Sequence, residues 1–240
     1  MKRITAAVLA LLLLAMCSSA SADLVGPIRY ESNFNTMVFG RYEQDNDPDT
    51  EPEPITWIIL DEQDGKRLLI SRDLLDCKRF NEVYGPITWE ECTLRTWLNE
   101  EFLQTAFSEE EQAAIPLTDV DNSKAQDNPD YHDTTSGNNT QDRIFLISAG
   151  EALKYFPDNE SRRSVPTEYA IARGAKYDHA YQIDGRQCGW WWFRSAGPHQ
   201  WRASIAYAPG TLRYTFTTRI FIGVRPMLWV DLSKLPEEAE

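Results

Sequence analysis

The chain has 240 residues, of which 37 are acidic and 24 are lysine or arginine, so its formal net charge is −13 at pH 7. A chain this acidic, with no basic stripe, is not expected to bind nucleic acid or anionic lipid. Hydrophobic residues make up 42% and include eight tryptophans, which argues against disorder of the chain as a whole.

The first 22 residues are organised like a bacterial secretory signal peptide. Two basic residues follow Met1, and residues 6–16 form an apolar run too short to span a bilayer comfortably. The small residues at 20–22 then fit a signal peptidase site. We therefore expect cleavage after Ala22 and a secreted, extracellular protein.

Lipidation at Cys17 is the alternative interpretation of the same segment, but Met16 is larger than the small residue expected before a lipidated cysteine. No later run is long enough for a transmembrane helix, so we expect no membrane anchor after cleavage. Cleavage lowers Lys plus Arg from 24 to 22 against 37 acidic residues, giving a mature charge of −15.

The length of the mature chain fits one domain. We expect residues 23–36 to be a lead-in, residues 37–231 a single domain and residues 232–240 an acidic tail. The pattern along the domain predicts the α+β class, with helices in the first half and an antiparallel sheet at the C-terminal end.

Strands are predicted first, at residues 37–42, 55–60 and 66–71. An acidic, proline-rich loop, QDNDPDTEPEP, separates the first two runs. The last two flank DEQDG, whose Asp64-Gly65 pair predicts a hairpin turn.

Helices are predicted next by three capping boxes, and a further helix is expected over residues 167–173 with Gly174 ending it. After the first box, apolar residues recur at helical spacing, with Arg95 and Asn99 on the neighbouring stripe. The polar run 117–142, between the second and third boxes, has a length typical of functional or mobile loops. The boxes are Thr88 with Glu91, Ser108 with Glu111, and Ser148 with Glu151.

The C-terminal third predicts strands, beginning with GWWWFRS at residues 189–195. Alternation places Trp191 on one face, expected to be the core, and Trp190, Trp192 and Arg194 on the other. The second set, with Arg225, is a candidate site for a sugar or peptide, through stacked rings and planar guanidinium groups. The alternative is that both arginines are structural and bond carboxylates or loop carbonyls.

Several phrases in one order closely resemble the secreted bacterial family catalogued as domain of unknown function 6273. The resemblance runs from about residue 37 to 231 and implies membership without implying an activity. The phrases are ITWIIL, LLISRDLLD, TWEECTLRTWLNEEFLQTAFSEEEQAAI, TQDRIFLISAGEALKYF, WWFRSAG and GVRPMLWV.

More distantly, WWFRSAG followed by GVRP resembles the end of the C-type-lectin-like and formylglycine-generating enzyme (sulfatase-modifying factor) superfamily. Gly223-Val224-Arg225 stands where that superfamily has a Gly-aromatic-Arg motif, so the resemblance implies a C-type-lectin-like fold. The oxidising members hold copper through a cysteine pair near this arginine. No cysteine follows Cys188 here, so that chemistry is not carried over.

Metal and disulfide sites have few candidates. The three histidines (His132, His179 and His199) are isolated, so no transition-metal site is expected. Asp119 and Asp121 begin like a calcium loop, although the glycine and glutamate of such a loop are missing. Cys77 and Cys92 form a disulfide only if their Cα atoms lie within about 7 Å; the alternative is three free cysteines.

No GxSxG elbow is present, and adjacent glutamates on a helix face different directions, so no catalytic set is predicted. We therefore expect a secreted or surface-associated binding module without catalytic activity, with a carbohydrate, cell-wall or protein ligand. The alternative is an extracellular enzyme, either a hydrolase or an oxidoreductase of the formylglycine-generating kind.

Overall fold

The computed structural model describes residues 34–131 and 133–235. The predicted signal peptide, its cleavage site after Ala22, the lipidation alternative at Cys17 and the last five residues of the predicted tail lie outside this part, as does His132. Among the described residues, none of the helices has the length and apolar character needed to cross a bilayer.

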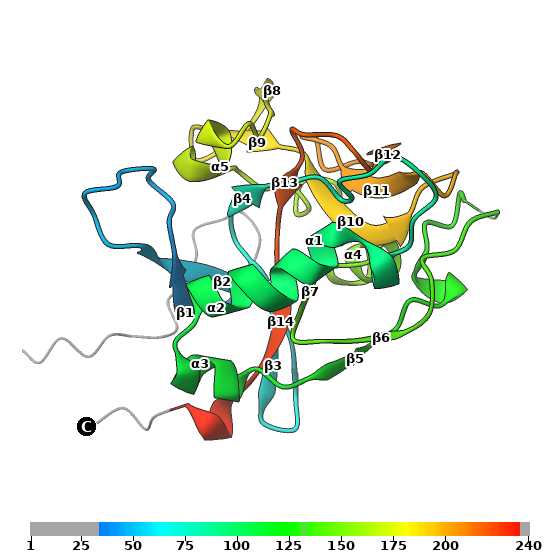
Figure 1. The fold of residues 1–240 in the computed structure, drawn as a ribbon. Coiled ribbons are helices and arrows are strands. Elements are labelled where there is room, and N and C mark those ends of the chain that lie inside the picture. Colours follow the sequence, from blue (N-terminus) through cyan, green and yellow to red (C-terminus); the bar gives the residue numbers. More distant parts are fainter. Residues whose placement is uncertain (1–33, 132, 236–240) are drawn as a thin grey trace, which may run out of the picture.

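Two five-stranded sheets form the framework (Figure 1). The first sheet is antiparallel throughout, and its fourth strand comes from the far C-terminal end of the chain. In spatial order it consists of β1 (Thr36–Tyr42), β2 (Glu53–Gln63), β3 (Lys66–Ser71), β14 (Met227–Asp231) and β7 (Ile144–Phe145).

The second sheet is antiparallel except for one parallel pair, β10 with β13. Its order is β12 (Leu212–Phe216), β11 (Arg202–Ala206), β10 (Trp191–Ala196), β13 (Gly223–Val224) and β4 (Asp76–Cys77). Two small pairs complete the strands: β5 (Thr118–Val120) with β6 (Thr140–Asp142), and β8 (Tyr177–Ile183) with β9 (Arg186–Gly189).

The longest helical segment crosses the junction of the two sheets (Figure 1) and contains a π-helical turn between two α-helical parts. It consists of α1 (Thr93–Trp97), η2 (Leu98–Phe102) and α2 (Leu103–Ala106). The other helices are η1 (Trp89–Glu91), α3 (Glu109–Ala114), η3 (Lys124–Gln126), α4 (Ala149–Tyr155), α5 (Glu168–Ala172) and η4 (Leu232–Lys234).

The predicted hairpin is confirmed. β2 and β3 pair up to Gln63 and Lys66, and the two residues between them, Asp64 and Gly65, have φ of 50° and 74°. Two consecutive positive φ values define a type I′ turn, whose twist matches that of the strands, and an Asp-Gly pair tolerates it well.

Two of the three predicted capping boxes form. Ser108 with Glu111 and Ser148 with Glu151 each make both reciprocal hydrogen bonds. The box at Thr88 is wrong, because its side chain makes no capping bond and only a short 3₁₀ turn follows. The backbone becomes extended again at Cys92, so the α-helix begins at Thr93 instead.

The mixed α+β class is confirmed, but its layout differs from the prediction. The α-helices lie in the middle of the chain, between residues 93 and 172, and four strands precede them in the sequence. β14 then pairs with β3, about 160 residues earlier, so the C-terminal segment completes the first sheet as well as the second. Local periodicity carries no signal for such a distant pairing.

The main core is a large cluster that extends across both sheets and the helical segment, and two small clusters lie apart from it. β10 lies in the middle of the second sheet, and all six of its residues are buried. The largest fully buried side chains include Trp57, Trp89, Trp191, Trp192 and Phe102.

Candidate functional site

The strand predicted to present a ligand platform lies inside the protein. Trp191 and Trp192 are both 0% exposed, although they point to opposite faces of the sheet. Trp192 packs against Phe80, and its indole N–H donates to the Lys78 carbonyl at 2.9 Å. Both faces of β10 therefore lie in the core, whereas the sequence pattern predicted that only one face would.

Arg194 is 1% exposed, and its guanidinium holds four parts of the chain together. It donates to both carboxylate oxygens of Glu151 at the start of α4, with one contact at 2.9 Å. Further bonds go to the Asn122 side chain and to the carbonyls of Leu146 and Asp121. Charge-assisted bonds of this kind fix a buried arginine, so Arg194 has the structural role considered as the alternative.

Arg225 is also 1% exposed. Its Nε donates to the Ser71 carbonyl at 2.8 Å, and its guanidinium lies 4.8 Å from the ring centre of Trp191 and 5.3 Å from that of Phe156. The positions of Trp192, Arg194 and Arg225 thus give no support to direct ligand contact. Trp190 alone among the four predicted ligand residues is partly exposed.

The predicted disulfide between Cys77 and Cys92 is wrong. Both thiols are free, as is that of Cys188. Cys77 lies on β4 beside Ala170 and Ala175, whereas Cys92 belongs to the main core, so the two occupy different apolar clusters. Burial raises the pKa of Cys77 and of Cys92 to about 12, and that of Cys188 to about 11. Protonated, buried thiols are poor nucleophiles.

The calcium candidates serve the folding of their own loop. Asp121 accepts hydrogen bonds from the Ser123 backbone and the Gln126 side chain, and the first of these lowers its pKa. Asp119 accepts from the side chain of Gln141 across the β5–β6 pair.

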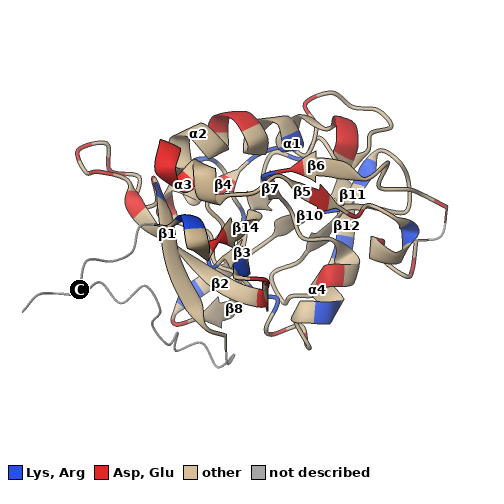
Figure 2. Cartoon of the chain, turned by 90° about the horizontal axis from the view of Figure 1, so that it is seen from below, with Lys and Arg blue, Asp and Glu red and all other residues tan. Residues whose placement is uncertain are grey.

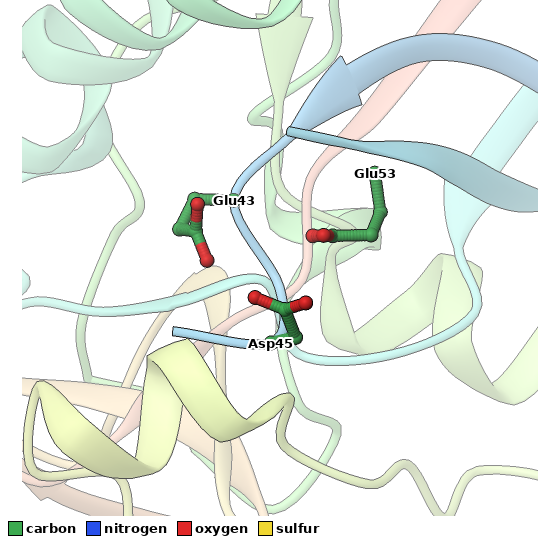
Figure 3. A group of neighbouring side chains, drawn as sticks. All are labelled: Glu43, Asp45 and Glu53. Atoms are coloured by element: carbon green, nitrogen blue, oxygen red, sulfur yellow. The ribbon is translucent and has the colours of Figure 1, made fainter. Parts of the chain in front are cut away.

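Within the described ranges, the group of carboxylates close enough to share a cation is Glu43, Asp45 and Glu53, at the end of β1 and the start of β2 (Figure 3). Their oxygens lie within 4.8 Å of one another. Each side chain already accepts a backbone N–H of the same loop, and these bonds account for the arrangement.

A surface feature does emerge at the outer edge of the second sheet. Tyr214 and Phe216 alternate on one face of β12, and Arg202 of β11 lies directly opposite Phe216. The Arg202 guanidinium lies 5.0 Å from the ring centre of Tyr214 and 4.8 Å from that of Phe216. One planar cation therefore rests on two rings, within the range of cation–π attraction.

This arrangement continues in both directions along the surface. Tyr131 packs edge-on against Tyr214, and Tyr84, 63% exposed, packs against Phe216. On the other side, Arg219 lies over Phe216 and Phe221, and Lys176 lies 4.4 Å from the centre of Phe221. We call these residues the aromatic-cation row: Tyr84, Tyr131, Lys176, Arg202, Tyr214, Phe216, Arg219 and Phe221. Trp190 contacts its end at Phe221.

The cations of this row have no acidic partner among the residues that the structure describes. Within the described part of the chain, no carboxylate lies within 4.0 Å of the charged nitrogens of Lys176, Arg202 or Arg219. The Nε of Arg202 is buried and has no hydrogen-bond acceptor there either. The row thus holds positive charges next to one another without internal neutralisation.

The row has a clear signal in the sequence that pattern reasoning overlooked. Residues 185–230 contain no aspartate or glutamate, although the chain has 37 of them. The same segment contains six arginines. Figure 2 shows basic segments at β11 and β12, away from the acidic loop after β1. The arginines are Arg186, Arg194, Arg202, Arg213, Arg219 and Arg225.

Comparison with known proteins identifies the family. The family model described as a domain of unknown function, DUF6273, matches residues 64–232, and the chain belongs to this family. Neither the curated proteins nor the solved structures include a match.

Proposed function

We propose that the protein is a secreted or surface-associated binding module that takes an anionic glycan on the aromatic-cation row. The observation that carries the proposal is the grouping of Lys176, Arg202 and Arg219 on aromatic rings, without a carboxylate partner in the described part of the chain. Cations that a fold positions but does not neutralise are suited to an anionic ligand.

The chemistry of the row matches both parts of such a ligand. Exposed rings such as Tyr84 and Tyr214 offer apolar faces to sugar rings, and their hydroxyl groups offer hydrogen bonds. A guanidinium held against a ring has lost much of its freedom before binding and presents a fork that fits a carboxylate or phosphate.

The net charge of −13 does not oppose local binding of an anion. Exposed charges are screened beyond about 8 Å at physiological ionic strength. The 46 residues that include β10 to β13 contain no acidic side chain, so the nearest charges along this part of the chain are positive.

The secretory N-terminal pattern supports a location outside the cell, where cell-wall and other glycans are found. The distant resemblance of WWFRSAG and GVRP to the C-type-lectin-like superfamily is part of the same proposal. The two sheets of the chain and the position of WWFRSA on the central strand β10 are compatible with it.

Calorimetric titration of the purified chain with polygalacturonate tests the proposal, with dextran as the neutral polysaccharide and polyglutamate as the acidic polypeptide. We expect binding to polygalacturonate that weakens with added salt. Replacing Arg202 and Arg219 together by glutamine is expected to weaken it at least tenfold, about 1.4 kcal/mol.

Arg41→Gln is the matched control. Arg41 is exposed on β1 of the other sheet, and the change removes one positive charge, against two in the double variant, without touching the row. Equal binding by the double variant and the unchanged chain would refute the site, and equal binding of dextran would refute the anionic ligand. Tighter binding of polyglutamate would indicate an acidic protein as the partner instead.

A further inference from the structure

A pocket lies on a part of the molecule that contributes nothing to the aromatic-cation row. It is formed by the helical segment 93–106 and by the residues just before β7, and it has a volume of about 320 Å³. Its lining includes Arg95, Asn99, Glu100, Leu117 and Arg143. The volume is near the lower end of the range for ligand pockets, roughly 300–1,000 Å³.

One amide side chain, that of Asn99, connects the helical segment beside the pocket to the residues just before and within β7. Asn99, in the π-helical turn η2, accepts hydrogen bonds from the backbone N–H groups of Arg143 and Ile144. Its Nδ2 donates to the carbonyls of Ile144 and Arg95, at 2.8 and 3.0 Å. A π-helical turn is rare and frequently marks a functional site. Here it places Asn99 and Glu100 in the pocket wall.

Two arginines line the pocket, and among the described residues only one of them has a carboxylate partner. Arg95 is neutralised by Asp142, with Nε 2.6 Å from Oδ1. Arg143 is held by neutral partners instead, because its Nη1 donates to the carbonyls of Gln112 and Ile115 at 2.8 and 2.7 Å. Among the described residues, no carboxylate pairs with Arg143. Its guanidinium is therefore fixed at the C-terminal end of α3, without a carboxylate partner among the described residues.

The opposite charge and an apolar surface are present in the same lining. Glu100 is exposed and has no ion-pair partner among the described residues. Leu117 is 58% exposed, an unusual position for a large apolar side chain, and it lies beside Leu103 in the pocket wall. Among the described residues, the lining thus offers a cation and an anion that form no ion pair, together with an apolar contact.

We propose that this pocket binds a zwitterion, a free α-amino acid or a dipeptide with an apolar side chain. The ligand carboxylate pairs with Arg143, its ammonium group with Glu100, and its side chain packs on Leu117. The pocket volume of about 320 Å³ suits a ligand of this size. This inference is independent of the glycan proposal, because the two sites share no residue.

Calorimetric titration of the full chain with L-leucine and L-leucyl-L-leucine tests the inference, with N-acetyl-L-leucine as the ligand lacking the ammonium group. We expect the chain to bind at least one of the two zwitterions and to bind N-acetyl-L-leucine at least tenfold more weakly. Glu100→Gln should weaken zwitterion binding at least tenfold, since an exposed glutamate can be replaced without unfolding the chain.

Glu101→Gln is the matched control, because Glu101 is the exposed neighbour on the same turn and does not line the pocket. Unchanged binding by this variant, together with the loss in Glu100→Gln, supports the site. The inference is overturned if neither zwitterion binds at about 10 mM, if N-acetyl-L-leucine binds equally well, or if both variants behave alike.

Discussion

Arg194 and Arg202 lie on neighbouring, paired strands, yet the fold uses them in opposite ways. Arg194, on the central strand β10, is enclosed and neutralised by Glu151. Arg202, nearer the edge on β11, rests on Tyr214 and Phe216 and has no acidic partner within the described residues. The first arginine links separate parts of the protein, and we propose that the second binds the ligand.

The difference comes from what covers each strand. The face of β10 that carries Arg194 meets the start of α4 and the loop at Asn122, both of which supply acceptors to Arg194. No helix contributes acceptors to Arg202 in the described structure, so aromatic rings from its own sheet support it instead. The depth of each arginine in the sheet therefore decides whether acceptors from other elements or rings of the same sheet support its guanidinium.

The largest expected effect is on the buried member of the pair. Arg194→Met should lower the free energy of unfolding by about 3–5 kcal/mol, because it leaves the Glu151 carboxylate without its charged partner. Arg202→Met should lower it by only about 1 kcal/mol, because it removes the cation–π contacts with Tyr214 and Phe216. Urea denaturation followed by tryptophan fluorescence measures both. Similar losses in the two variants would contradict the distinction.

Trp192 and Trp190, two residues apart, extend the comparison between enclosed and surface positions to tryptophan. Trp192→Ala should cost about 3–5 kcal/mol, since the ring is fully enclosed against Phe80. Trp190→Ala should cost less, because Trp190 is only partly buried and borders the surface at Tyr207 and Phe221. Thermal unfolding of the two variants compares them. A greater loss of stability in Trp190→Ala than in Trp192→Ala would contradict this assignment of the core.

The smallest expected effect is the pH dependence of stability that the buried Cys92 thiol causes. Burial raises the pKa of Cys92 from 9.0 to about 12 in the folded state. The stability gained from the protonated thiol is complete below about pH 9 and is lost as the pH rises toward 12. We expect the free energy of unfolding to fall between pH 9 and 11 under reducing conditions, and to fall less in Cys92→Ala. An identical pH dependence of the two proteins would contradict the burial of this thiol.

The sequence predicts those parts of the fold that depend on near neighbours. Asp64-Gly65 specifies its turn, and Ser108 and Ser148 specify two helix starts, because each acts through bonds spanning one to three residues. Thr88 has the same local pattern but fails, since the chain becomes extended at Cys92 before a helix can form.

The candidate site was only partly visible in the sequence. Alternation separated Trp191 from Trp192 correctly by face, but it carries no information about Asn122 and α4, which cover the second face from distant parts of the chain. The absence of acidic residues over 185–230 was the readable signal for the aromatic-cation row. Its contact with Tyr84 and Tyr131 depends on tertiary structure and has no local pattern.

Arginine modification by phenylglyoxal, mapped by mass spectrometry with and without polygalacturonate, tests the central claim most directly. We predict that the polysaccharide protects Arg202 and Arg219, leaves Arg41 equally reactive, and does not affect Arg194, which is unreactive in either state because it is buried. Protection of Arg41 to the same degree, or no protection of Arg202 and Arg219 at saturating polysaccharide, would contradict the assignment of the row as the binding site.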